Sequence, residues 1–236
     1  MRYRFDDKEF GLVIVYTRRD ARRVKVRWDG DHLKLTVPEM LPNDSILQIF
    51  ESMRDDIRLL KRNTVTFSIG QTIQCIGCSI VIGKQNTKPH SILYGQNHDD
   101  DNYYINLPAD INLDSEIAKK QVSLIIGEMI AHAAKYHLLP LAQEVADRLS
   151  VAVARFEVGR GMRKLGHCTS KSVIQLSRNL MLLPRDLAEY IICHELAHIT
   201  YPNHSPQFHA LVNRYTDGHE APHQPQLKAN NCPIIQ

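Results

Sequence analysis

Apolar and polar residues alternate in the first part of the chain as they do in β-strands. In the stretch RVKVRWDGDHLKLTV (residues 23–37), every second residue is apolar on either side of Asp29-Gly30. An Asp-Gly pair between two such runs is a strong signal for a tight β-hairpin. The pattern predicts strands over residues 10–37, and shorter β-like runs recur between residues 64 and 107 and between 151 and 177.

Other segments carry apolar residues at intervals of three and four, as helices do. The first covers residues 44–61, where Asn43 or Asp44 can serve as the N-cap. The same spacing predicts four further helices: residues 115–138, a shorter helix that follows Pro140 and ends near Leu149, residues 184–201, and residues 205–215. Proline marks several of these limits, because it is tolerated in the first turn of a helix and disfavoured in the interior.

Strands and helices therefore follow one another in alternating groups, which predicts an α+β fold. We expect a β-rich N-terminal part over residues 1–110 and a helical core over residues 111–216. Residues 217–236 are rich in Pro, His, Gln and Asn and lack periodicity, so we expect a flexible tail there.

Composition narrows the class of protein. The chain has 236 residues, 43% of them hydrophobic, which is enough for a substantial core. No apolar run approaches the roughly 18 residues of a membrane-spanning helix, and the first ten residues lack the apolar segment of a secretory signal. Five irregularly spaced cysteines are typical of reduced thiols. These features predict a cytoplasmic protein with no membrane partner.

The strongest chemical signal is the stretch HELAHITYPNH, residues 194–204. On a helix, His194 and His198 lie one turn apart on one face, so both imidazoles can bind one cation. Glu195 is rotated by about 100° from His194, which suits a base that contacts a water better than a third ligand. The pattern H-E-x-x-H is typical of zinc hydrolases in which the glutamate is the general base.

A catalytic zinc site takes three protein ligands and keeps one position open. His204 follows His194 by ten residues, the spacing of the metzincin motif, although Tyr201 stands where that motif has glycine. His209 and Glu220 are alternative third ligands, and the spacing leaves the choice open. We expect one Zn2+ per chain.

A polar patch on an ordinary helix is the competing interpretation. The motif is flanked by apolar residues on nearly every other side: Ile191, Ile192, Leu196, Ala197 and Ile199. Two histidines and a glutamate on so buried a helix would be costly without a metal or polar partners. The pattern therefore favours a metal site.

The run YIICHELAHITYPNHSPQF, residues 190–208, resembles the core of the YgjP-like, SprT-related zinc metallopeptidases, whose pattern is an apolar run, H-E-L-A-H, and then N-H-S followed by Phe. The upstream run KLGHCTSKSVIQLSRNLMLLP resembles the stretch that precedes the active-site helix in that family. The resemblance is close over residues 160–215 and looser elsewhere. Four positions near the site depart from the family pattern: Leu165, His167, Ser177 and His209.

This resemblance implies a zincin-like fold, in which a mixed sheet packs on the HExxH helix. It implies that His194, His198 and His204 hold zinc and that Glu195 is the general base. The expected activity is hydrolysis of a protein or peptide substrate, in which Glu195 takes a proton from water and passes it to the leaving amine. The developing oxyanion needs a further donor. The candidates are Tyr201, His167 and Arg163.

A second hypothesis is a metal-stabilised module that binds nucleic acid without hydrolysing anything. Residues 1–62 hold 14 Lys and Arg against 11 Asp and Glu, which accounts for the whole net charge of +3. Several basic residues cluster there: Arg18, Arg19, Arg22, Arg23, Lys25 and Arg27. They could contact phosphates, although a solvated sheet face also explains them. Glu195 favours the enzyme, because a structural zinc needs no base.

Two other groups of metal-type side chains have simpler interpretations. Cys75 and Cys78 form a single CxxC pair, and a structural zinc site there would need distant partners. We expect them to be reduced thiols on strands. His132 and His137 lie on the helix predicted over residues 115–138 and are interpreted as packing or surface residues.

Overall fold

The computed structural model describes residues 3–29, 32–60, 67–85, 91–97, 99–160 and 164–229. The chain divides into two compact units, Met1–Thr64 and Val65–Gln236. Several sheets and helices make up these units, which confirms the predicted α+β class. Within the described ranges, no helix combines the length and the hydropathy needed to cross a membrane.

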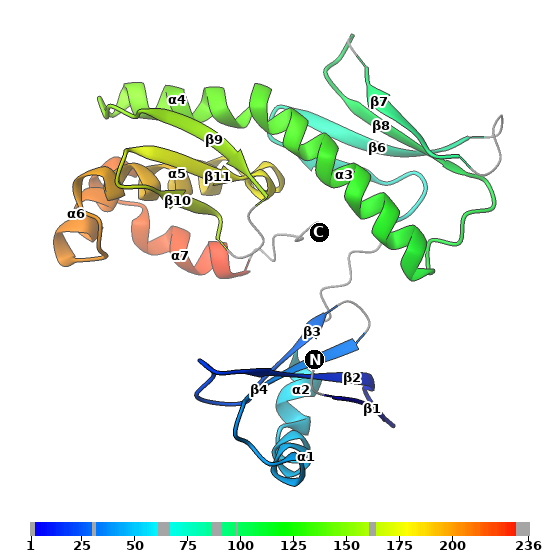
Figure 1. Cartoon of the computed structure of the whole chain (residues 1–236). Helices are drawn as coiled ribbons and strands as arrows, with labels where there is room; N and C mark the ends of the chain where they lie inside the picture. The colour runs from blue at the N-terminus through cyan, green and yellow to red at the C-terminus, as the bar shows by residue number, and fades with distance from the viewer. Residues whose placement is uncertain are drawn as a thin grey trace. The chain divides into compact units, whose positions relative to one another are not determined.

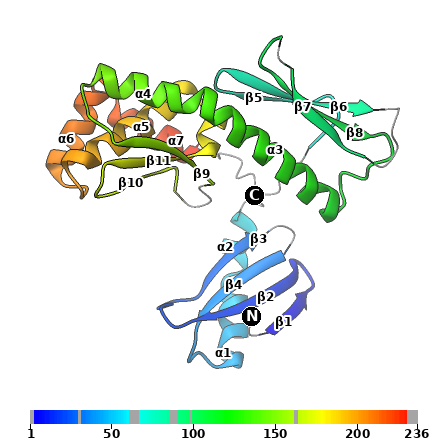
Figure 2. The same cartoon turned by 45° about the horizontal axis from the view of Figure 1, so that its top comes forward.

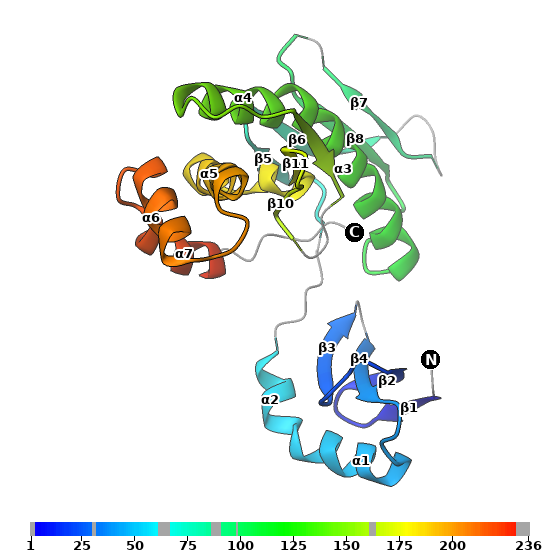
Figure 3. The same cartoon turned by 60° about the vertical axis from the view of Figure 1, so that its left-hand side comes forward.

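The N-terminal unit is a four-stranded sheet with two helices on one face (Figure 1 and Figure 3). Its strands are β1 (Tyr3–Asp7), β2 (Gly11–Arg18), β3 (Lys25–Asp29) and β4 (His32–Pro38), in the order β1-β2-β4-β3. β3 and β4 pair antiparallel with Asp29 opposite His32, which confirms the predicted hairpin. The expected turn residue Gly30 lies outside the described residues.

Two short helices cover this sheet, α1 (Asn43–Ser52) and α2 (Arg54–Leu59). The single helix predicted over residues 44–61 is therefore broken, at Met53. Asp55 and Asp56 lie in the first turn of α2, where negative charge favours a new helix N-terminus. Apolar residues from the strands and both helices form one core: Phe10, Val13, Val15, Leu33, Leu35, Val37, Ile46, Phe50 and Ile57.

An ion pair joins the end of β1 to the start of α2. Arg54 Nη2 lies 2.6 Å from Asp7 Oδ2, and the Asp7 side chain is only 8% exposed. The backbone N–H groups of Glu9 and Phe10 donate to Asp7 Oδ1 at 2.9 and 3.0 Å. The hydrogen bond from Arg54, helped by these backbone donors, lowers the pKa of Asp7 to about 2.

The C-terminal unit contains two mixed sheets. The first has the order β5-β6-β8-β7 and consists of β5 (Thr72–Cys75), β6 (Cys78–Gln85), β7 (Leu93–Gln96) and β8 (Tyr103–Pro108). The second has the order β10-β11-β9 and consists of β9 (Arg155–Gly159), β10 (Gly166–Cys168) and β11 (Val173–Ser177). The pairs β6–β8 and β9–β11 are parallel, and the other pairs are antiparallel.

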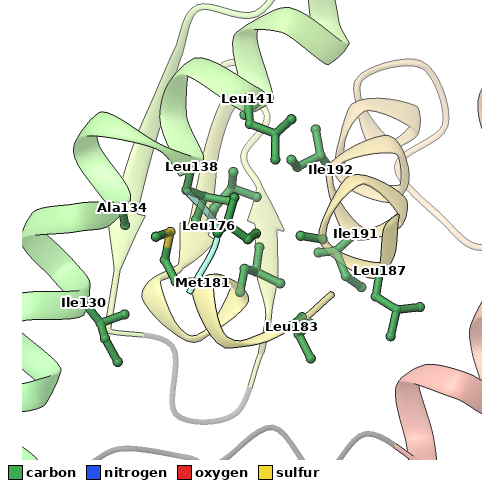
Figure 4. Packing of buried hydrophobic residues seen from close by; sticks show 14 of the residues in the cluster. Ile130, Ala134, Leu138, Leu141, Leu176, Met181, Leu183, Leu187, Ile191 and Ile192 are labelled. Atoms are coloured by element: carbon green, nitrogen blue, oxygen red, sulfur yellow. The ribbon is translucent and has the colours of Figure 1, made fainter. Parts of the chain in front are cut away.

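Two consecutive helices, α3 (Glu116–Tyr136) and α4 (Leu138–Arg148), connect these sheets (Figure 2). The break between them falls at His137, three residues before Pro140, because a proline nitrogen has no hydrogen to donate to the carbonyl of Tyr136. The 3-10 turn η1 (Arg178–Leu182) and the helix α5 (Arg185–Thr200) follow β11. Figure 4 shows how they meet in the core; its labelled side chains include Ile130, Ala134, Leu138, Leu141, Leu176, Met181, Leu187, Ile191 and Ile192.

The two units divide near residue 64, whereas the sequence predicted a boundary near residue 110. Burial explains the difference. Apolar residues of β6 and β8 belong to the same core as α3, α4 and α5: Ile80, Ile82, Ile105 and Leu107. The sheet β5-β6-β8-β7 is therefore part of the C-terminal unit and not of the β-rich N-terminal part.

The segment predicted as a flexible tail contains a further helix, α7 (Glu220–Ala229). Several contacts bind it to the rest of the unit, among them that of the His223 ring with the ring of Tyr190 on α5. Glu220 is buried and lies 2.6 Å from His209 Nδ1, and Leu227 packs against the core. Such contacts between distant residues do not appear in the local pattern of the sequence, which reads as polar and irregular.

Replacing Asp7 with asparagine tests the ion pair of the N-terminal unit. Loss of the charged hydrogen bonds to Arg54 should lower the free energy of unfolding by about 1–3 kcal/mol at pH 7. Folding moves the pKa of Asp7 from its ordinary 3.8 to about 2, so this stabilisation is complete above the ordinary pKa and is lost as the pH falls toward 2. Urea unfolding at a series of pH values measures the difference between wild type and variant.

That difference should stay constant from pH 7 to about 5 and shrink below about 4. Asp6→Asn is the matched control, since Asp6 is the exposed neighbour of Asp7 on β1. An equal loss in both variants, or a difference that does not change with pH, would contradict this account of the ion pair.

Candidate metal centre

The HELAH stretch lies in the second half of α5, and most of this helix is buried. Its core-facing residues include Leu187, Ala188, Ile192, Leu196 and Ala197. The helix ends at Tyr201, whose backbone is extended (φ −124°, ψ 98°). Pro202 is the cause, because a residue before proline is sterically excluded from the helical region.

His204 is positioned by the start of the next helix, α6 (Pro206–Tyr215). Ser205 is the N-cap, and its Oγ accepts the backbone N–H of Phe208 at 3.3 Å, with Pro206 in the first turn. The short connection between α5 and α6 brings His204 beside α5. The ring nitrogens of His194, His198 and His204 lie within 4.8 Å of one another. Among the described residues, no other group of three His, Cys, Asp or Glu side chains brings its potential metal-ligand atoms so close together.

The spacing of these nitrogens fits a single metal ion. His194 Nε2 and His204 Nε2 are 3.1 Å apart, and two ligands of one tetrahedral zinc ion are separated by about 3.3 Å when each bond is about 2.0–2.1 Å. His198 Nδ1 lies 3.1 Å from the carbonyl oxygen of Tyr201. That carbonyl can only accept, so Nδ1 carries the hydrogen and Nε2 keeps a lone pair for a metal.

The ring of Phe208 packs against all three imidazoles. Its centroid lies 4.8 Å from the His194 ring, 4.5 Å from the His198 ring and 4.8 Å from the His204 ring. Phe208 is fully buried. The three rings therefore pack on one shared, buried apolar support.

The surroundings favour the neutral form of the two helix histidines, His194 and His198. Burial, helped by the neighbouring His198 and His204, lowers the pKa of His194 to about 4. Burial is also the largest cause of the lowered pKa of His198. Neutral imidazole is the form that donates a lone pair to a metal, so the electrostatics agree with the geometry.

Glu195 is 7% exposed and faces β10. Burial raises the pKa of its carboxyl to about 7, while Lys164 and the backbone N–H of Cys168 act in the opposite direction. A carboxyl with a pKa near neutrality can both accept and donate a proton. A Cβ added at Gly166 would lie 2.5 Å from Glu195 Cγ and Oε1, so only glycine leaves room for this side chain.

The cluster opens into a cavity of about 570 Å³ whose walls come from α5, β10 and the loops beside them. His194, Glu195, His198 and His204 all line it, and so does the exposed His167. β10 is an edge strand, since the sheet order is β10-β11-β9. The cavity thus combines a potential metal site, a buried carboxyl and a strand edge.

The remaining candidates from the sequence take other positions. His209 and Glu220 pair with each other at 2.6 Å and do not join the group of three histidines. Tyr201 contributes its backbone carbonyl, which is an acceptor and contacts His198. Arg163, proposed as an oxyanion donor, lies outside the described residues.

Three residues around Glu195 were missed by the sequence reasoning: Lys164, Gly166 and Cys168. All three lie in the run KLGHC, which was singled out only for its resemblance to the family. Their role arises from the approach of β10 to α5, which a local pattern does not encode.

The pair Cys75 and Cys78 lies at the turn between β5 and β6, where the two residues are direct partners in the ladder. Their thiols are free and hydrogen-bonded to each other. No third metal-type side chain joins them among the described residues. The expectation of reduced strand cysteines agrees with this arrangement.

Comparison with protein families places these features in a known context. A family model described as YgjP-like, metallopeptidase domain matches residues 22–230, which is most of the chain. The matched segment includes the histidine cluster and Glu195. Comparison with curated proteins gave no match, and comparison with solved structures gave none either.

The contact between Gly166 and Glu195 can be tested by adding a single methyl group. Gly166→Ala should displace the buried carboxyl and lower the free energy of unfolding by about 1–3 kcal/mol. In a Glu195→Ala background the collision is absent, so the same substitution should cost much less. A double-mutant cycle measured by urea unfolding gives the coupling between the two positions.

Ser170→Ala is the control, because Ser170 is an exposed residue of the same cavity. It should have the same small effect in both backgrounds. If Gly166→Ala costs as much without the Glu195 side chain as with it, the close approach of β10 to α5 is not what requires glycine.

Proposed function

The chain belongs to the YgjP-like metallopeptidase family, and on this premise we propose that it is a zinc-dependent peptidase with a zincin-like active site. One observation carries the proposal: three ring nitrogens converge within 4.8 Å of one another in a cavity that also contains a buried carboxyl. The substrate would be a protein or peptide.

His194, His198 and His204 would hold the metal through their Nε2 atoms. Imidazole ligands suit several transition metals, and the H-E-x-x-H spacing favours zinc among them. A zinc ion bound there supplies a Lewis acid, which lowers the pKa of a water and polarises a carbonyl group. Phe208 and the carbonyl of Tyr201 would keep the three rings oriented.

Glu195 would act as the general base and then as the general acid. Its carboxylate would accept the proton of the attacking water and pass it to the leaving amine. The backbone N–H of Cys168 donates to this carboxylate and fixes its orientation. Gly166 leaves the space in which it lies.

The edge strand β10 would position the substrate. An extended peptide can add to a strand edge through main-chain hydrogen bonds, and here the edge borders the cavity that holds His194 and Glu195. His167 lies on this strand and lines the cavity. We therefore propose His167 as the donor to the oxyanion that develops on the substrate carbonyl.

A purely structural metal site is less consistent with these features. Structural zinc sites are closed by four protein ligands, whereas the group of described residues here has three. The family match likewise favours a peptidase over a module that only binds.

The metal ligands can be tested by metal analysis of purified variants. The wild-type chain should retain about one zinc after dialysis, and His194→Ala, His198→Ala and His204→Ala should each lose most of it. His209→Ala is the matched control, since His209 lies on α6 near the cluster and pairs with Glu220. If His209→Ala loses the zinc and His204→Ala keeps it, the assignment of the third ligand is wrong.

The general base can be tested with Glu195→Gln, which keeps the shape of the side chain and cannot accept a proton. We expect normal folding and zinc content, with hydrolysis reduced by about a hundredfold or more. The substrate is a mixture of unfolded peptides, and mass spectrometry of the products after a fixed time measures cleavage.

Two results would count against this mechanism. A zinc-loaded wild type that cleaves no more than Glu195→Gln would support a non-hydrolytic protein. Loss of zinc from Glu195→Gln would make Glu195 a ligand or a support of the ligands and would exclude the proposed role as base.

A second proposal concerns the basic residues of the N-terminal unit and nucleic acid. All six are exposed: Arg18, Arg19, Arg22, Arg23, Lys25 and Arg27. Three of them form ion pairs, Arg18 with Asp20, Arg19 with Glu39, and Arg27 with Asp29. No ion pair joins Arg22, Arg23 or Lys25 to another described residue, and these three are the proposed phosphate contacts.

Salt dependence tests this proposal. Binding of a labelled duplex DNA should weaken steeply as the salt concentration rises. Replacing Arg22, Arg23 and Lys25 with glutamine should make the slope of log K against log salt less negative by about 2–3. Replacing the exposed Lys120, Lys135 and Lys171 changes the net charge equally and is the control. Absence of binding at low salt would leave these residues as a solvated surface.

A further inference from the structure

A second cavity, of about 910 Å³, lies in the C-terminal unit apart from the histidine cluster. Its walls come from β7, β8, the loop between them and the C-terminal half of α3, which run side by side (Figure 1 and Figure 2). The two cavities have no lining residue in common among the described residues. The proposed peptidase chemistry makes no use of this second cavity.

Aromatic rings form much of its wall. Tyr103 is buried, while Tyr94 and Tyr136 are 51% and 63% exposed. The ring of His132 lies 5.0 Å from that of Tyr136, and a hydrogen bond of 2.8 Å joins His132 Nδ1 to the hydroxyl of Tyr103. Two of the tyrosines thus contact one histidine on α3, and the exposed Tyr94 and Tyr136 both line the cavity.

The charged residues of the wall have a single sign. Asp101 and Glu128 contribute carboxylates, and no lysine or arginine belongs to the described lining. Glu128, His132 and Tyr136 follow one another at intervals of four along α3 and so share one face of the helix. Carboxylates together with tyrosine faces attract organic cations, so the cavity is complementary to a positively charged group.

The cavity also borders a strand edge. β7 is the last strand in the order β5-β6-β8-β7, and it pairs with β8 on one side. No strand of the described ranges pairs with its other side. An extended polypeptide can add to such an edge through main-chain hydrogen bonds, with alternate side chains facing the same way.

We propose that this cavity binds an extended polypeptide segment and receives one of its lysine or arginine side chains among Tyr94, Tyr136 and the two carboxylates. The backbone of the segment pairs with β7. In the peptidase proposed above, the segment belongs to the substrate, and this identification rests on the proposed function. The binding itself depends neither on metal nor on hydrolysis.

The test uses the full-length Glu195→Gln chain, which leaves a bound peptide intact. Labelled nine-residue peptides, blocked at both ends, differ only in a central lysine, norleucine or glutamate, and fluorescence anisotropy measures their affinity. The lysine peptide should bind about tenfold or more tightly than the glutamate peptide, and added salt should reduce the difference. The same affinity should be found in His194→Ala, which separates this site from the metal centre.

Substitutions in the wall should weaken binding of the lysine peptide. Tyr136→Ala and Glu128→Gln should each cost about two- to fivefold, as expected for contacts with a cation at partly exposed positions. Tyr104→Ala and Asp99→Asn are the matched controls, because both residues are exposed near β7 and β8 and neither lines the cavity. All four positions are exposed, so the variants should unfold at the wild-type temperature.

Three results would overturn the proposal. The first is equal affinity for the lysine and glutamate peptides, and the second is an equal loss of affinity in the control variants and the cavity variants. The third is displacement of the lysine peptide by free butylamine at a concentration similar to that of the peptide. The last would make the site one for small amines. If the peptide binds as expected and the wild type cleaves nothing, the binding site stands and only its identification as a substrate site fails.

Discussion

Apolar packing holds α5 in the core of the C-terminal unit along most of its length. Leu187, Ala188, Ile192, Leu196 and Ala197 are all buried there. Successive residues of a helix are rotated by about 100° about its axis. Because the apolar side chains are fixed in the core, the directions of the polar side chains on the same helix are fixed too. His194 and His198 therefore face the segment that follows α5, which carries His204, and Glu195 faces β10.

The helix carries polar groups into buried positions, and neighbouring groups satisfy them. The carbonyl of Tyr201 accepts from His198, and the N–H of Cys168 donates to Glu195. Without such partners a buried polar group is destabilising. Phe208 adds a rigid apolar support beneath the three imidazoles. This combination, three imidazole nitrogens held together with one buried carboxyl beside them, is the physical basis for the proposed zinc chemistry.

Both sheets of the C-terminal unit present an edge strand beside a cavity. β10 borders the histidine cluster, and β7 borders the cavity lined by tyrosines and carboxylates. α3 and α4 belong to the single core that includes residues of both sheets. A polypeptide that pairs with a strand edge could thus be bound at two places in one unit, once for chemistry and once for recognition of a basic side chain.

The sequence by itself determined the elements whose causes are local. Alternation and an Asp-Gly pair predicted the β3–β4 hairpin, Pro202 and Ser205 marked the end of α5 and the start of α6, and the HELAH spacing placed two histidines on one helical face. The tertiary structure alone decided contacts between distant segments. It joined His204 to the pair and paired His209 with Glu220, a choice that spacing had left open. It also put β5 to β8 in the C-terminal unit and gave Gly166 its place against Glu195, because burial and close approach depend on the packing of segments far apart in the chain.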